Sequence, residues 1–195
     1  MRKFILILFL IFSFQSLTKA DDVRDLEISK ISVGDSLLDY FTLETIKNGV
    51  RTDYVYKDDT FYDVEIYNHK SIKDYNGLSF SLKKNDKLYQ IYQVVGFNFY
   101  EDNVDECFKK VDEVANEISE VLKNLNRAES ERPHGDDPTG NSLTKQIVFW
   151  HESGTVFTEC YDWSEKITKE KKWTDNFSVG IALKEYDLWL NNKAY

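Results

Sequence analysis

"NVDECFKKVDEVANEISEVLKNLN", residues 103–126, decides the fold class of this chain. Its apolar residues recur at spacings of three and four, and Lys, Asp and Glu fill the positions between them. This periodicity predicts one amphipathic helix whose apolar stripe is wide enough to cover a sheet face. Asn103, with Glu106 three residues later, resembles a capping box at the helix start. A helix that binds a partner protein shows the same pattern, so that alternative stays open.

The segments on either side of this helix alternate between apolar and polar residues, as half-buried strands do. Three strands are expected before the helix, as an antiparallel meander in which Gly96 marks a bulge or bend. A hairpin that turns at Ser153-Gly154 and one further strand are expected after it. The expected strands lie at residues 61–68, 78–85, 89–100, 145–152, 155–163 and 177–183.

Ser36 and Thr42 are suitable N-caps for two short helices near the N-terminus, and a short helix is expected to end the chain. The element order is that of an α+β fold. We therefore predict an antiparallel sheet of about five to six strands, covered on one face by the long helix. One domain is expected over residues 21–195, with residues 127–142 as a flexible polar loop that holds both prolines.

The first twenty residues are typical of a secretory signal peptide. A basic start is followed by the apolar run 4–14, and Thr18 and Ala20 occupy the −3 and −1 positions of a plausible cleavage site. The run is shorter than the roughly 20 apolar residues of a membrane-spanning helix. An uncleaved N-terminal anchor is the alternative. Cleavage predicts a periplasmic or secreted protein with no membrane span after the leader is removed.

The charge of the chain narrows the choice of partners. The net charge is −9, and loss of Arg2, Lys3 and Lys19 with the leader would make it −12. Such a charge repels phosphate backbones and anionic lipid surfaces, so neither nucleic acid nor an anionic membrane is an expected partner.

The chain holds two cysteines, Cys107 and Cys160. In an oxidising compartment two cysteines usually pair. Cys107 lies on or beside the apolar stripe of the predicted helix, and Cys160 shares one face of its predicted strand with Val156 and Thr158. If that face meets the helix, the two sulfurs approach each other. We therefore predict a disulfide between helix and sheet.

A secreted cysteine hydrolase that uses Cys107 and His151 is the alternative. A cysteine near a helix N-terminus has a lowered thiol pKa, and papain-like cell-wall peptidases place such a cysteine before a histidine on a strand. Those enzymes follow the cysteine with Ser-Gly, whereas here Phe108 and Lys109 follow. Cys107, Cys160 and His151 could also hold zinc, but they lack the paired spacing of zinc sites.

Other constellations are less specific. "GDDPTGNS" (135–142) has nearly the spacing of a phosphate-binding loop, but Asn141 replaces the lysine and a strand follows, so neither nucleotide nor another cofactor is expected. His134, Asp136 and Asp137 match no calcium loop, so no metal site is predicted. Glu152 and Glu159 are expected to lie near each other on the hairpin arms, as chance alone would allow among 34 acids.

Three stretches carry a resemblance: "ISVGDSLLDYF" (31–41), "CYDWSE" (160–165) and "NNKAY" (191–195). Over most of the mature chain the sequence resembles a group of small secreted proteins of marine alphaproteobacteria with small, AT-rich genomes. No activity is assigned to that group, so the resemblance implies a periplasmic location and nothing about mechanism. "ISVGDS" is also similar to the start of small outer-membrane assembly lipoproteins, whose lipid-bearing cysteine this chain lacks.

The residues assemble no convincing catalytic set. The sequence is therefore interpreted as a soluble periplasmic binding or envelope accessory protein without catalysis. Exposed aromatic residues would be its partner contacts, since aromatic side chains anchor interfaces. The candidates are Tyr161, Trp163 and Trp173, for which burial in the core is the alternative.

Overall fold

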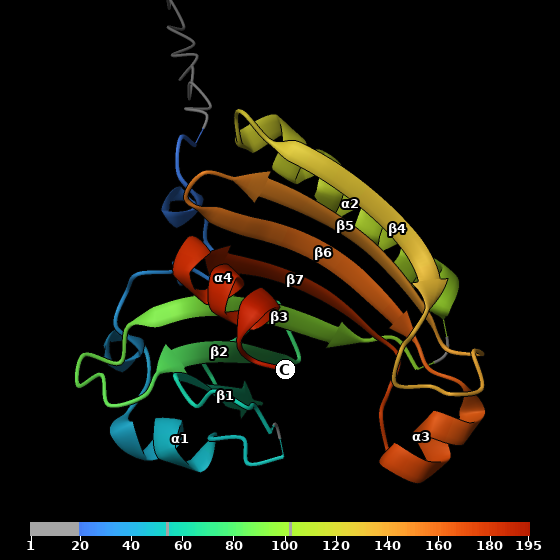
Figure 1. Ribbon diagram of the computed structural model, residues 1–195, viewed down its shortest axis with the longest axis horizontal. Helices are drawn as coiled ribbons and strands as arrows, with labels where there is room; N and C mark the ends of the chain where they lie inside the picture. The colour runs from blue at the N-terminus through green and yellow to red at the C-terminus, as the bar shows by residue number, and fades with distance from the viewer. Residues whose placement is uncertain (1–19, 54, 102) are drawn as a thin grey trace, which may run out of the picture.

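The computed structural model describes residues 20–53, 55–101 and 103–195. Seven antiparallel strands form one sheet in the order β1-β2-β3-β7-β6-β5-β4 (Figure 1). The strands are β1 (Phe61–Tyr67), β2 (Gly77–Lys83), β3 (Ile91–Phe99), β4 (Asn126–Pro133), β5 (Leu143–His151), β6 (Gly154–Asp162) and β7 (Asn176–Leu183). The α-helices are α1 (Leu43–Asn48), α2 (Val104–Val121), α3 (Glu165–Lys171) and α4 (Lys184–Asn192), and the 3-10 helices are η1 (Val23–Asp25) and η2 (Leu37–Asp39).

The α+β class is confirmed, but the expectation of five to six strands was too low. The additional strand is β4, which occupies the first half of the stretch expected to be a flexible loop. It pairs with β5 along its whole length, from Asn126 opposite Trp150 to Pro133 opposite Leu143. Seven of its eight residues are exposed. Because neither face of β4 is buried, its sequence lacks the alternation that marks a half-buried strand.

The long helix α2 lies behind the sheet and contacts β5, β6 and β7 (Figure 1). The Asn103 side chain accepts a hydrogen bond from the Glu106 backbone N–H, which confirms the predicted cap. The helix ends at Val121, before the predicted Asn126, because Leu122 is already extended. Its buried residues are Cys107, Val111, Ala115 and Ile118.

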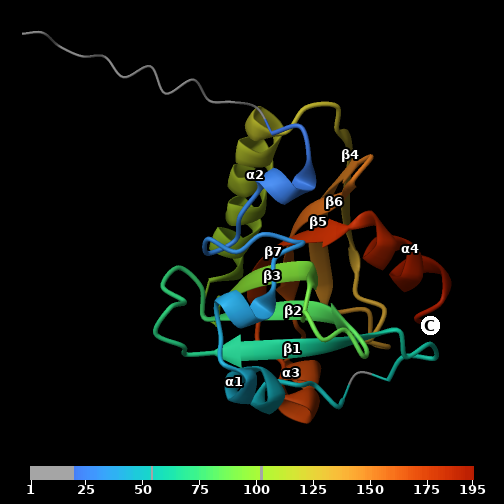
Figure 2. The same cartoon turned by 90° about the vertical axis from the view of Figure 1, so that its left-hand side faces the viewer.

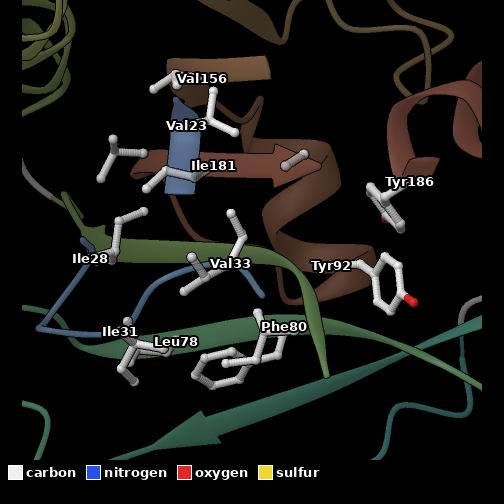
Figure 3. Close-up of a cluster of buried hydrophobic side chains, with 14 of the residues drawn as sticks. Val23, Ile28, Ile31, Val33, Leu78, Phe80, Tyr92, Val156, Ile181 and Tyr186 are labelled. Atoms are coloured by element: carbon white, nitrogen blue, oxygen red, sulfur yellow. The ribbon is translucent and has the colours of Figure 1, made fainter. Parts of the chain in front are cut away.

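The helix covers only part of that sheet face. Over the β2–β3 half the N-terminal segment completes the core, as Figure 3 shows for Ile28, Ile31 and Val33 beside Leu78 and Phe80. Within residues 26–33 the chain turns at Ser29 and Lys30, which both have positive φ, and Ile28 and Ile31 form an isolated bridge across this turn rather than a strand of the sheet. The apolar face of this sheet is therefore shared between a helix and an irregular segment.

The opposite face of the sheet carries α4, which contacts β3, β6 and β7 (Figure 2). Tyr186 and Trp189 of α4 pack against Phe61, with ring centroids 5.3 and 4.9 Å away. The ring of Tyr92 joins them because the β2–β3 register shifts beside Leu82. The expected irregularity at Gly96 is wrong: Gly96 lies in regular pairing opposite Leu78, and the Tyr75 ring packs against it.

Candidate functional site

Cys107 and Cys160 form a disulfide with a Cα–Cα distance of 5.9 Å, as predicted. It joins the first turn of α2 to the middle of the sheet, and both residues are fully buried. These are the only two cysteines of the chain, so neither sulfur is a thiol in this structure. The bridge is a structural element that holds the helix to the sheet.

His151 lies far from the disulfide. Cys160 is paired with Lys145, and His151 is six residues further along β5, which corresponds to about 20 Å at the rise of a strand. The His151 ring Nδ1 is 2.7 Å from the Ser153 hydroxyl, within the hairpin turn. A cysteine hydrolase or a zinc site built on these residues therefore has neither the free thiol nor the geometry that it needs.

The turn between β4 and β5 is held by Asp137. Its carboxylate accepts hydrogen bonds from the hydroxyls of Thr139, Ser142 and Ser164, at 2.6 to 2.8 Å. These bonds, that of Thr139 foremost, hold the Asp137 pKa well below its usual range. Ser164 is also the N-cap of α3, so Asp137 joins the turn to that helix. Its oxygens serve the fold, and within the described residues no three His, Cys, Asp or Glu side chains gather as metal ligands.

The antiparallel register arranges the side chains on the α4 side of the sheet in four transverse rows. The row from Asp63 to Asn126 passes beneath α4 at Thr155, whose hydroxyl donates to Asp187, and it ends in the exposed Trp150 and Asn126. The other three rows make up what we call the open face. These rows are Glu65–Ser79–Val95–Gly180–Phe157–Val148–Ala128, Tyr67–Gly77–Phe97–Ser178–Glu159–Gln146–Ser130 and Phe99–Asn176–Tyr161–Thr144–Arg132.

One end of the open face carries an aromatic group from β1 and β3. The rings of Tyr67 and Phe97 are 5.3 Å apart, and those of Phe97 and Phe99 are 5.8 Å apart. Tyr67 and Phe99 are 45% and 43% exposed, which is unusual for side chains of this size on a sheet. The alternation of the strands indicates that these residues face away from the α2 core, but their gathering in one place depends on the strand order.

A second aromatic group lies at the end of β6. Tyr161 stacks on Trp163 with ring centroids 5.4 Å apart, and Trp173 lies 4.6 Å from Trp163. All three predicted contact residues thus come together, and each is half-buried. His134, which the sequence pattern does not link to these aromatic residues, completes the group with its ring centroid 4.5 Å from that of Trp163. The Lys171 ammonium lies 4.3 Å from the centre of the Trp173 ring, a cation–π contact.

Glu159 lies between the two aromatic groups, opposite Gln146 rather than beside Glu152 as expected. Its side chain accepts a hydrogen bond of 2.8 Å from the Gln146 amide. Burial raises the Glu159 pKa, while hydrogen bonds from Tyr161 and Gln146 act in the opposite direction. Only 8% of Glu159 is exposed, so the open face presents its charge weakly.

Two hollows lie away from the open face. One, of about 450 Å³, is lined by Arg51 and Tyr56 from the segment between α1 and β1, by the start of β1, and by Lys84 just after β2. The other, of about 370 Å³, lies at the β2–β3 turn between Tyr62 and Tyr89. The open face is therefore a broad surface of rings and short polar side chains, which suits contact with another surface better than enclosure of a small molecule.

In comparisons with known proteins, no protein-family profile, no curated protein and no solved structure matches the chain. Among residues 20–53, 55–101 and 103–195, no helix has the length and apolar character needed to cross a membrane.

Proposed function

We propose that this protein is a non-catalytic binding or envelope accessory protein that contacts a protein partner through its open face. The observation that carries the proposal is the composition of that surface. Thirteen of its nineteen residues are not buried, and of these thirteen four are aromatic and two are charged, about 31% and 15%, against 15% and 30% in the whole chain. Aromatic enrichment and depletion of charge distinguish the centres of protein interfaces from other surface.

The charges of the open face are already partly neutralised within the chain. The Glu65 carboxylate accepts a bond from Arg51, which leaves Arg132 as the strongly exposed charge at the edge. A surface with few free charges loses little hydration when a partner covers it, and this favours association. Of the seven other residues that are not buried, four offer hydrogen bonds without a large desolvation penalty: Ser79, Ser130, Gln146 and Asn176.

The proposed place of action is the periplasm or the exterior of the cell. The disulfide supports this proposal, because such bridges persist in oxidising compartments. The predicted leader, residues 1–20, lies outside the described residues except for Ala20. The resemblance to secreted alphaproteobacterial proteins stays a prediction that points to the same compartment.

Site-directed photo-crosslinking in the native cell tests the binding surface. A photoreactive phenylalanine analogue is placed at Phe99, 43% exposed on the open face, and in a separate variant at Leu188, 55% exposed on α4. We expect a discrete adduct from position 99, identifiable by mass spectrometry, that is absent from position 188. Equal adducts from both positions, or none from position 99 at native expression, would contradict the proposal.

A further inference from the structure

The two edges of the sheet differ in how they end. At the β1 edge the chain's own backbone covers the strand: the Arg51 N–H donates to Asp63 O at 2.9 Å, and the Glu65 N–H donates to Gly49 O at 2.8 Å. At the β4 edge, no backbone hydrogen bond from the described part of the chain reaches the outer side of residues 126–133. That edge therefore presents alternate N–H and C=O groups that only solvent or another chain can satisfy.

Edge strands are usually protected against pairing by bulges, by proline, by charged side chains, lysine above all, or by short length. β4 has eight residues, paired with β5 without a register shift, and is longer than the average strand of about five to six residues. Its one proline, Pro133, is its last residue, and it contains no lysine. The outer side of β4 thus has the regular geometry that strand addition requires.

The charges of β4 are complementary to themselves. Arg127 and Glu129 lie two residues apart on one face of the strand, where they form an ion pair of 3.3 Å within the chain, and their side chains are 41% and 52% exposed. When two copies of β4 pair antiparallel about a two-fold axis at Ala128, Arg127 of each copy lies opposite Glu129 of the other. Ala128 then lies opposite Ala128, and Asn126 lies opposite Ser130. Opposite charges that face each other across strands stabilise their pairing.

The neighbouring registers differ in that each brings like charges together. With the axis at Glu129, Arg127 of each copy faces Glu131 of the other, but two glutamates face each other at the centre. With the axis at Ser130, Glu129 of each copy faces Glu131 of the other. We propose that the protein forms a symmetric homodimer through β4, in the register centred on Ala128, so that two sheets join into one of fourteen strands. The occupant of this edge is a second copy of the same chain, as in most symmetric dimers.

The symmetry of such a dimer has a consequence for the open face. An antiparallel pair of identical strands has its two-fold axis perpendicular to the sheet, so both open faces lie on the same side. Two linked surfaces bind a repeated or dimeric partner far more tightly than one does. The dimer itself follows from β4 alone, so it stands or falls independently of the proposed function.

Sedimentation velocity over a range of protein concentrations, with the disulfide intact, tests the dimer. The wild type is expected to shift from monomer to dimer as the concentration rises. Arg127→Glu and Glu129→Arg each place like charges across the axis, and each should weaken dimerisation by about tenfold or more. The double exchange R127E/E129R restores opposite charges across the axis and should restore the dimer.

Glu131→Arg is the matched control, because in the proposed register residue 131 lies opposite Leu125 and its charge faces no charged residue of the other copy. It should leave dimerisation unchanged, whereas with the axis at Glu129 it would place two arginines face to face. Circular dichroism and thermal unfolding establish that each variant is folded. A wild type that stays monomeric up to the highest soluble concentration would overturn the proposal, as would a double exchange that stays as weak as the single variants.

Discussion

Two glycines of the open face determine where its aromatic rings lie. Gly180 of β7 is opposite Phe157, and Gly77 of β2 is opposite Phe97. A Cβ atom at Gly180 would lie 2.2 Å from the Phe157 ring, and one at Gly77 would lie 2.4 Å from the Phe97 ring. The rings therefore rest on the bare backbone of the neighbouring strand. This close approach, rather than backbone flexibility, is what requires glycine at these positions.

Gly180→Ala is expected to lower the free energy of unfolding by about 1–3 kcal/mol, because the Phe157 ring must leave its rotamer and the strands must shift. Urea denaturation measures the change. Gly135→Ala is the matched control, since a Cβ there has nothing within 4 Å and should change stability by no more than about 0.5 kcal/mol. Equal stability of the two variants would show that Phe157 does not rest on Gly180 in solution.

At the scale of elements, the structure depends on how α2 is attached to the sheet. The helix buries Val111, Ala115 and Ile118 on the sheet face, and its first turn is tied to β6 by the disulfide. Lys145 of β5 forms an ion pair of 2.7 Å with Asp112 of α2, but the Asp112 side chain is half exposed, so this pair adds little. Apolar packing and the covalent link therefore provide most of the attachment.

Removal of the disulfide by C107A/C160A is expected to lower the free energy of unfolding by about 4 kcal/mol, the chain-entropy value for residues separated by 53 positions. The fold should persist, because the apolar stripe of α2 remains. Urea denaturation of the variant, compared with the wild type in reductant, provides the measurement. The two should unfold at the same urea concentration, and a wild type insensitive to full reduction would contradict the expectation.

At the scale of the whole molecule, buried carboxyl groups gather on the α4 side of the sheet. Burial raises the pKa values of Asp63, Glu159 and Asp187, and that of Asp187 reaches about 6. A folded-state pKa above the unfolded value means that the folded form binds more protons. The contribution of such a group to stability therefore decreases as the pH rises through the window between the two values.

For Asp187 this window extends from the ordinary value of 3.8 to about 6. Asp187→Asn keeps an oxygen that accepts the Thr155 hydrogen bond and removes the buried charge. The variant should be more stable than the wild type by about 1–2 kcal/mol at pH 7.5, and the difference should vanish near pH 4. Thermal or urea unfolding at both pH values tests this. A difference that is independent of pH would show that Asp187 titrates normally.

The sequence by itself determined the elements whose signal is local. The apolar stripe of residues 104–121 predicts α2, and the alternation in β2 and β7 predicts strands, because one buried face imposes a period of 3.6 or 2 on the chain. The disulfide could also be predicted from the sequence, since Cys107 lies on the apolar stripe of α2 and Cys160 shares a strand face with Val156. Asn103, Ser36 and Thr42 act as caps as expected, because capping is a property of a few neighbouring residues.

Only the tertiary structure decided the features that depend on strand order. β4 has no apolar face, so nothing in its own residues distinguishes it from a loop until β5 pairs with it. His134 joins Tyr161 and Trp163, and Phe97 comes into one row with Glu159, through the register of strands far apart in the chain. The local alternation of apolar and polar residues tells which face of the sheet a side chain lies on. Its neighbours on that face are set by the pairing of strands that are far apart in the sequence. The open face and the free β4 edge therefore exist only in the folded molecule.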